Sequence, residues 1–334
     1  MSVELGRLSH WRDTAGVDEA KARELAARLE LRARAEDEVA VRDDYVRLLG
    51  VAPGERVLDV GCGSGALTRT LAQQVAPGGR AVGIDTSPAL LGVARELADA
   101  AGLGGVVEFQ EADCRALPFS GASFDAVVAA TTLCHVPDAG RALAEMVRVI
   151  RPGGRVGVFD LDGDSFLIAH PDRELTRRIV AAYSDQGMVN SWLVRGLPAV
   201  LADLGIVNVR TQGFMPLETG GYYADLAGRA AQLAAQAGAI TSVELQHWLD
   251  ALRAEIAGGP LPWRPAPSLC LGDAPGGVTQ PTSRVPFLHV IPTKGENMTT
   301  RKKIQVDFEY EEVLDAKTRR LIQVGCAVAV GCPT

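Results

Sequence analysis

Three glycines and two acids near residue 60 have the identities and the spacing of a ligand site. An apolar run that contains Asp59 leads into Gly61, Gly63 and Gly65, and a helix-like segment follows at once. A strand, a tight turn and a helix N-terminus in this order predict a nucleotide site, because glycine lets the backbone turn sharply and lets a ligand approach the main chain. The second acid, Asp85, ends the next apolar run, where nucleotide-binding α/β folds hold ribose hydroxyls.

The glycine loop alone does not name its ligand. Gly61, Gly63 and Ala66 also satisfy the dinucleotide fingerprint, which tolerates alanine at its last position. Asp59 favours a different ligand, because a carboxylate just before the loop repels a pyrophosphate and attracts cationic groups. S-adenosylmethionine carries a sulfonium and an ammonium group, so we expect this methyl donor rather than NAD(P).

Five segments in order resemble the motifs of the class I S-adenosylmethionine-dependent methyltransferases, especially the small-molecule subgroup that includes the ubiquinone/menaquinone-biosynthesis enzymes. The resemblance implies a Rossmann-like α/β fold, with seven strands in a mostly parallel sheet and helices on both faces. It implies S-adenosyl-L-methionine as cofactor and methyl transfer to an O, N or C atom of a small-molecule acceptor, such as a secondary metabolite or a quinone-like compound. The matching segments are 57–65, 83–88, 111–119, 123–128 and 148–155.

The resemblance also assigns roles to single residues. Asp59 would hold the methionine part of the donor, Asp85 the ribose hydroxyls, and Asp113 the adenine amino group. Thr131 follows the fourth strand, whose carboxyl end faces the ligand crevice in such folds. The predicted cofactor-binding residues are Asp59, Gly61, Cys62, Gly63, Gly65, Asp85, Thr86, Asp113, Cys114 and Thr131.

Each acid in this set has a structural alternative. Asp59 could cap the amides of the glycine loop, and Asp85 could cap the next helix, as Thr86 or Ser87 could equally do. Asp113 could form a turn. Cys114 is expected to be a wall residue rather than a reactive thiol.

His135 is the candidate catalytic residue, because imidazole titrates near neutral pH and could act as a base or contact the acceptor. The alternative is a structural histidine packed against the following helix. A base is needed only if the nucleophile must lose a proton.

The segment after the fifth strand offers further polar groups. Asp160, Asp162 and Asp164 stand at alternate positions, which fits a divalent ion, an anchor for an amine substrate or a solvated acidic loop, and we expect the loop and no metal. The acceptor pocket is expected to draw on His170, Tyr183, Asn190, Trp192 and Arg195.

Composition limits the remaining function classes. The 334 residues carry a net charge of -7, which argues against a nucleic-acid-binding face. No apolar run is long enough for a membrane span or a signal core, and the six cysteines have no metal-type spacing. We therefore expect a cytoplasmic protein with a small-molecule acceptor, no nucleic acid and no membrane partner, and leave a homodimer open.

The chain divides into four regions by composition. Residues 1–50 are expected to form a helical cap, because apolar positions recur at helical spacing from 17 to 49. Residues 51–257 alternate strand-like and helix-like runs, which predicts the methyltransferase domain, and 219–257 within it are either a helical lid over the acceptor or two packed surface helices. We place strands near 56–60, 81–84, 106–110, 124–129, 154–160 and 207–214, and helices near 66–75, 88–101, 140–150 and 191–204.

From residue 258 the pattern changes. Residues 258–297 are rich in proline and glycine and are interpreted as a linker or junction, in which 285–291 is the favoured last strand and 268–271 the second choice. Residues 298–334 resemble the start of a carboxymuconolactone decarboxylase-like protein, cut short. Lysine also becomes frequent here, so a genuine fusion, a read-through junction and a disordered tail all stay open.

Two rival functions remain. An NAD(P)-dependent oxidoreductase would need a second nucleotide-binding half or a Tyr/Lys pair, and Tyr183 has no nearby lysine. A non-methylating protein, either a cyclase or a pseudoenzyme, would keep the donor site without methyl transfer. The presence of every donor motif favours the enzyme.

Overall fold

A computed structural model describes residues 11, 14–214, 222–258, 263–264 and 267–274. The chain falls into two units, residues 1–278 and 279–334, and all described residues belong to the first. The favoured last strand at 285–291 and the decarboxylase-like tail at 298–334 lie outside the described residues.

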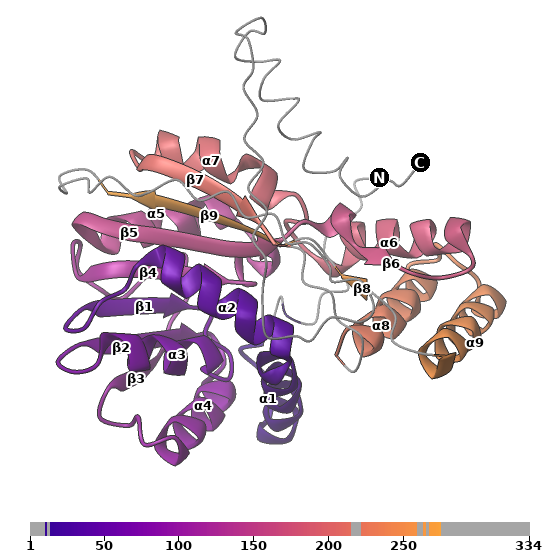
Figure 1. Cartoon of the computed structure of the whole chain (residues 1–334), viewed down its shortest axis with the longest axis horizontal. Coiled ribbons are helices and arrows are strands. Elements are labelled where there is room, and N and C mark those ends of the chain that lie inside the picture. Colours follow the sequence, from indigo (N-terminus) through magenta and orange to yellow (C-terminus); the bar gives the residue numbers. More distant parts are fainter. Residues whose placement is uncertain (1–10, 12–13, 215–221, 259–262, 265–266, 275–334) are drawn as a thin grey trace, which may run out of the picture. The chain divides into compact units, whose positions relative to one another are not determined.

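One sheet of seven strands organises the first unit, in the order β3-β2-β1-β4-β5-β9-β7 (Figure 1). Strands β1 to β5 within it run parallel, and β9 is antiparallel to both of its neighbours. The predicted seven-stranded, mostly parallel α/β sheet is confirmed. Its strands are β1 Arg56–Val60, β2 Arg80–Asp85, β3 Val107–Glu111, β4 Phe124–Ala130, β5 Ile150–Leu161, β7 Val207–Gly213 and β9 Pro267–Asp273. Two short strands, β6 Leu167–Ile168 and β8 Trp263–Arg264, pair separately.

Helices cover both faces of this sheet, as Figure 1 shows. Successive strand residues point to opposite faces, so β1 sends Val57 to one side and Leu58 and Val60 to the other. Val57 packs with α2 and α3, whereas Leu58 and Val60 pack with α5 and α7. The helices are α1 Glu19–Arg34, α2 Glu36–Leu49, α3 Ala66–Val75, α4 Pro88–Ala100, α5 Ala139–Val149, α6 Arg173–Gly187, α7 Leu193–Asp203, α8 Tyr222–Gln236 and α9 Ser242–Gly258.

The prediction of a linker from residue 258 onward was wrong for strand β9. This strand inserts between β5 and β7 and pairs with both, so the domain does not end at 257. The second-choice candidate, 268–271, lies within β9. The short apolar run of β9 lies beside prolines and predicts a strand only weakly. Its place in the sheet depends on pairing with β5 and β7, which are distant in sequence.

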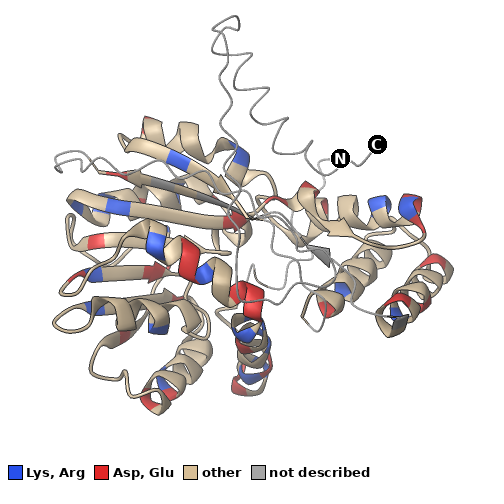
Figure 2. Ribbon diagram, viewed as in Figure 1, with Lys and Arg blue, Asp and Glu red and all other residues tan. Residues whose placement is uncertain are grey.

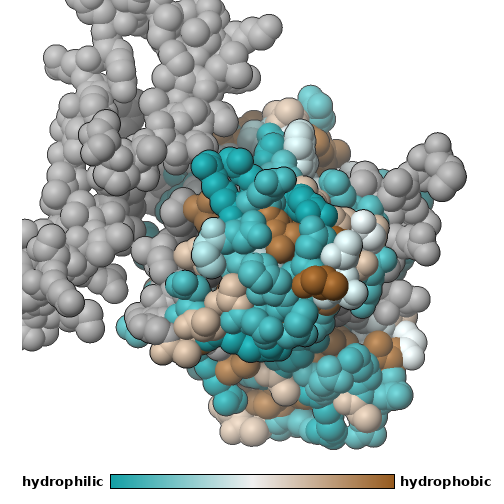
Figure 3. Space-filling model, turned by 90° about the vertical axis from the view of Figure 1, so that its right-hand side faces the viewer, coloured by the Kyte–Doolittle hydropathy of each residue, from teal (hydrophilic) through white to brown (hydrophobic). Residues whose placement is uncertain are grey.

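A helical layer of α6, α8 and α9 stands beside the sheet (Figure 1). Helix α6 was not predicted, although Asp172 caps its first turn by accepting a hydrogen bond from the amide of Leu175. Trp248 of α9 is fully buried in this layer and donates its indole hydrogen bond to Thr176 of α6. The outer face of the layer is mostly hydrophilic, with apolar side chains scattered singly (Figure 3).

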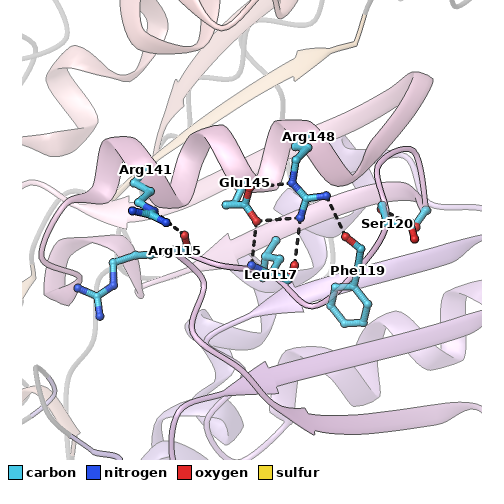
Figure 4. Close-up of polar contacts among 8 residues, drawn as sticks. Arg115, Leu117, Phe119, Ser120, Arg141, Glu145 and Arg148 are labelled. Carbon is cyan, nitrogen blue, oxygen red and sulfur yellow. Dashed lines mark hydrogen bonds and ion pairs between the residues drawn. The ribbon is translucent and has the colours of Figure 1, made fainter.

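Helix α5 fixes the loop between β3 and β4 (Figure 4). Arg148 donates hydrogen bonds to the carbonyls of Leu117 and Phe119, and the amide of Leu117 donates to Glu145 at 2.8 Å. Charged groups strengthen such bonds, so the loop is held firmly although it has no regular structure. The start of this loop carries Asp113 and Cys114.

The position of β9 predicts the effect of shortening the chain. A variant ending at Ala257 lacks the strand that joins β5 to β7, so we expect loss of cooperative unfolding, because two strand edges lose their partner. A variant ending at Val278 keeps the whole first unit and should unfold cooperatively. Circular dichroism during heating compares the two. Cooperative unfolding of the shorter variant would contradict the assignment of β9.

Candidate functional site

A cavity of about 450 Å³ lies at the carboxyl ends of β1, β2 and β4. The connection direction changes between β1 and β4, which is where open α/β sheets bind ligands. The structure brings ten of the eleven predicted site residues to its wall: Asp59, Gly61, Cys62, Gly63, Asp85, Thr86, Asp113, Cys114, Thr131 and His135.

Gly65 is the predicted residue that does not line the cavity. Its φ is +76°, and a β-carbon there would come within 2.8 Å of the Phe109 ring. Gly65 therefore lets α3 pack closely against β3, and its assignment to donor contact is not supported by its position.

The side chain of Thr132, which follows the end of β4, packs against the glycine turn. Gly61 has φ +72°, and a β-carbon there would lie 2.3 Å from the Thr132 side chain. The Thr132 hydroxyl lies 3.1 Å from the carbonyl oxygen of Val60. The amides of Gly61 and Cys62 both donate to the carbonyl of Ile84 at 2.8 Å, so the turn is shaped by its own hydrogen bonds.

Asp59 is buried, with 2% of its surface exposed, and accepts a hydrogen bond from the Thr68 hydroxyl at 2.6 Å. It does not cap the loop amides, which removes the structural alternative. Burial, together with the nearby charge of Asp85, raises the pKa of Asp59 to about 7, against the lowering effect of the Thr68 hydrogen bond. A cation at this wall of the cavity would restore the charged form.

Asp85 links the turn to the next helix. Its two carboxylate oxygens accept hydrogen bonds from the amides of Gly63 and Ser87, each at 3.0 Å. Helix α4 is instead capped by Ser87, so Asp85 is not the cap. Burial raises its pKa, opposed by these amides. Each carboxylate oxygen can accept a second hydrogen bond, which leaves two acceptor positions for a ligand.

Asp113 forms a turn and an ion pair. It accepts the amide of Arg115 at 2.8 Å and pairs with its guanidinium at 2.7 Å, which lowers the pKa of the carboxyl. The structural alternative for Asp113 is therefore present, alongside its place on the cavity wall. Burial raises the pKa of Cys114 to about 11, so this wall residue carries a neutral thiol.

Thr131 has φ +50°, a strained conformation for a β-branched residue, at the end of β4. Its hydroxyl accepts a hydrogen bond from Arg32 at 3.3 Å. Arg32 lies on α1 with 15% of its side chain exposed, pairs with Glu38 at 3.0 Å and lies 5.8 Å from the ring centroid of Tyr222. One guanidinium thus joins β4, α2 and α8.

His135 lies in a short 3₁₀ turn, Leu133–His135, directly after β4, and lines the cavity. This position suits a base or a contact to the acceptor. It also lies just before α5, so a structural histidine beside that helix stays the alternative.

The three acids at the end of β5 and just after it, Asp160, Asp162 and Asp164, have different partners. Asp160 is fully buried and accepts the amide of Cys134 at 2.9 Å, whereas Asp162 and Asp164 pair with Arg195. Across the described ranges, no group of three or more His, Cys, Asp or Glu side chains is arranged to hold a metal ion.

Of the five residues expected around the acceptor, Tyr183 alone is on the cavity wall. His170 is stacked on Trp248 and hydrogen-bonds its carbonyl, and Asn190 donates to two carbonyls of the β4–α5 connection. Trp192 is 58% exposed beneath the guanidinium of Arg195. These four are structural or surface residues in this fold.

The sequence predicted a helical cap and left a helical lid open, but Tyr183 was the one residue it named among those that line the wall opposite the glycine turn. This wall consists of the helical cap and of α8, the part of the expected lid that lines the cavity, while α9 packs behind α8 and does not reach the cavity. The sequence did contain an indication of this wall, because the charged residues Arg32, Glu38 and Arg42 interrupt the apolar faces of α1 and α2. The wall residues from these helices and from α6 are Leu29, Arg32, Ala33, Glu38, Arg42, Tyr45, Tyr183, Gly187, Tyr222, Leu226, Arg229, Gln232, Leu233 and Gln236.

Comparison with known proteins agrees with this geometry. Residues 58–158 match the family described as "Methyltransferase domain". A Streptomyces fradiae protein described as an uncharacterized 37.1 kDa protein in transposon TN4556 is 35% identical over 210 residues, which are 62% of this chain and 60% of that protein. A ubiquinone/menaquinone biosynthesis C-methyltransferase UbiE of Ectopseudomonas mendocina is 37% identical over 139 residues, 42% of this chain and 52% of that one.

A solved structure of a putative methyltransferase from Bacillus halodurans aligns over 70% of this chain and 99% of its own, with 19% identity and a TM-score of 0.48. The chain spans about half to three fifths of the length of the curated relatives named above. Within the described ranges, every helix is too short or too polar to cross a bilayer.

The closeness of Gly61 to Thr132 gives a matched test. Gly102 has the same φ of +72° but open space around it, so Gly102→Ala should cost only the backbone strain, about 1–2 kcal/mol. Gly61→Ala adds the collision with Thr132, and we expect about 1–3 kcal/mol more. Urea unfolding of both variants measures the difference. Equal losses would mean that Thr132 does not close the turn.

Proposed function

We propose that this chain, whose residues 58–158 belong to the methyltransferase-domain family, transfers the methyl group of S-adenosylmethionine to a small molecule. The single observation that carries the proposal is the pair of acids, the buried Asp59 and the half-buried Asp85, on the wall of one cavity beside the glycine turn. Burying a carboxylate without a partner is unfavourable, and a cationic donor supplies the partner.

The donor would lie along the ends of β1, β2 and β4. Asp59 faces its ammonium end, and Asp85, with two free acceptor positions, takes the ribose hydroxyls. Thr86 and Cys114 border the adenine. Asp113 would contact the adenine amino group with the lone pairs that its pair with Arg115 leaves free.

The chemistry supplied by the bound donor is an activated methyl group, whose bond to sulfur breaks as the acceptor's lone pair forms the new bond. The protein's own work is alignment and exclusion of water. Helix α8 covers the cavity with Tyr222 and Leu226. Where the acceptor must lose a proton, His135 is the proposed base.

The NAD(P)-dependent alternative is disfavoured by the sheet. Dinucleotide folds continue with a second parallel half, whereas here β9 runs antiparallel between β5 and β7. Among the described residues, the single lysine is Lys21, which is exposed on α1 and pairs with Glu24. A non-methylating cyclase or pseudoenzyme remains the second candidate, distinguished by turnover.

The acceptor is proposed to be a small secondary metabolite or quinone-like compound, by analogy with the UbiE relative. Charges of both signs are mixed along α1, α2 and α9 (Figure 2), which supports the absence of nucleic acid as a partner. A cytoplasmic location and, as an open option, a homodimer complete the proposal.

Calorimetric titration with S-adenosylmethionine and S-adenosylhomocysteine tests the donor site. We expect micromolar binding of both. Asp85→Ala should weaken binding at least tenfold, because hydrogen bonds to a charged group are worth about 1.5–3 kcal/mol. Asp185→Ala, an exposed acid on α6, should bind like the wild type. No binding to the intact protein would defeat the assignment.

The pKa of Asp59 predicts a pH dependence. Below about pH 7 the empty site holds the protonated acid, and the cationic donor then binds less tightly. Affinity for S-adenosylmethionine should therefore fall by up to about tenfold per unit as the pH is lowered below 7. Asp59→Asn should remove this step. A wild-type affinity that rises as the pH is lowered would contradict the role of Asp59.

A further inference from the structure

The half of the cavity that the donor motifs do not use is rich in arginine. Arg32, Arg42 and Arg229 line it from α1, α2 and α8. Arg28 stands one helical turn before Arg32 on the same face of α1. Its positive charge, with that of Arg32, opposes the rise that burial causes in the pKa of the wall residues Tyr183 and Tyr222.

The acids nearby do not balance these four charges. Glu38 is taken by Arg32 at 3.0 Å and by the hydroxyl of Tyr223. Asp225 pairs with Arg229 at 2.8 Å and is mostly exposed. Within the described part of the chain, Arg28 and Arg42 have no carboxylate partner, so this end of the cavity keeps an excess of positive charge.

Three of these arginines also carry an unused hydrogen-bond donor. The Nε atoms of Arg28, Arg42 and Arg229 are buried and have no acceptor. Arg42 does donate from Nη1 to the carbonyl of Ala33 at 2.9 Å, which holds its side chain between α1 and α2. Two of these donors, on Arg42 and Arg229, belong to residues that line the cavity. A buried donor without a partner is costly, so these two indicate a missing acceptor.

Aromatic rings form the rest of this wall. Tyr45 is stacked on Phe159 with ring centroids 4.6 Å apart, and both line the cavity with Tyr183 and Tyr222. Such walls suit a flat, largely apolar body. Charge and shape together describe an aromatic compound with an acidic group.

We propose that the methyl acceptor is an aromatic oxyanion, whose acidic group is bound by Arg42 and Arg229 while its ring lies against Tyr45, Phe159 and Tyr183. This rests on the proposed methyl transfer, since it assigns the acceptor of that same site. An anionic acceptor also complements the cationic donor across the cavity.

The test uses 4-hydroxyphenylacetate and its uncharged amide as probes. Each is titrated by calorimetry into the full chain, with and without saturating S-adenosylhomocysteine. We expect the carboxylate to bind about ten- to hundredfold more tightly than the amide, the range for hydrogen bonds to a charged group. Phenyl phosphate, as a third probe, distinguishes a phosphate site from a carboxylate site.

Two variants from different helices guard against a folding artefact. Arg42 also borders a shallower groove between α1, α3 and α4, so Arg42→Gln is paired with Arg229→Gln. Both should lose most of the preference for the anion and keep their affinity for S-adenosylhomocysteine. Arg47→Gln, an exposed residue of α2 paired with Asp44, is the control and should keep the preference.

The outcomes separate the two proposals. Equal binding of carboxylate and amide, no binding of either anion, or a preference that survives in both variants would overturn the anionic acceptor while leaving methyl transfer intact. Failure of S-adenosylhomocysteine to bind would instead overturn the donor assignment, and the titrations without it still decide whether the arginines bind an oxyanion.

Discussion

The buried carboxylate of Asp59 is the constraint on which the site depends. It sits on a central strand with Thr68 of α3 as its hydrogen-bond partner, and burial brings its pKa to about 7. A helix placed directly after the strand must bring Thr68 back over Asp59, and only a tight turn through Gly61 and Gly65 allows that return. The glycines, the acid and the helix therefore form one unit, whose charge a cationic donor in the cavity would balance.

The wall opposite the glycine turn depends on the contacts of one guanidinium group, that of Arg32. Arg32 contacts Thr131 of the donor side, Glu38 of the cap and the ring of Tyr222 on the lid. Its side chain is only 15% exposed, so each of these partners compensates part of the loss of water. The cap and the lid are thereby tied to the end of β4, and the cavity between them carries negative charge at the donor end and positive charge at the other. That division of charge is what a cationic donor and an anionic acceptor require.

Much of the sheet could be predicted because local pattern and tertiary position agree there. Strand β1 and helix α3 have the bounds expected from the apolar run and the glycine turn. Strand β9 was only the second choice for the last strand, because Pro267 and the short run after it predict a strand weakly. Its position in the sheet depends on pairing with β5 and β7. Asp113, on the cavity wall, shows the same limit of prediction from local sequence. Its position on the wall followed from the motif, but its pair with Arg115 depends on how the loop folds.

The sequence by itself determined the donor half of the cavity, since Asp59, Gly61 and Asp85 lie close to one another along consecutive strands and short-range geometry brings them together. Only the tertiary structure decided the other half. Arg42 and Arg229 are separated by most of the domain, and nothing in their local sequence marks them as neighbours. They share a wall because α2 and α8 pack around the same opening, and packing between distant helices leaves no periodic or motif signal in the chain.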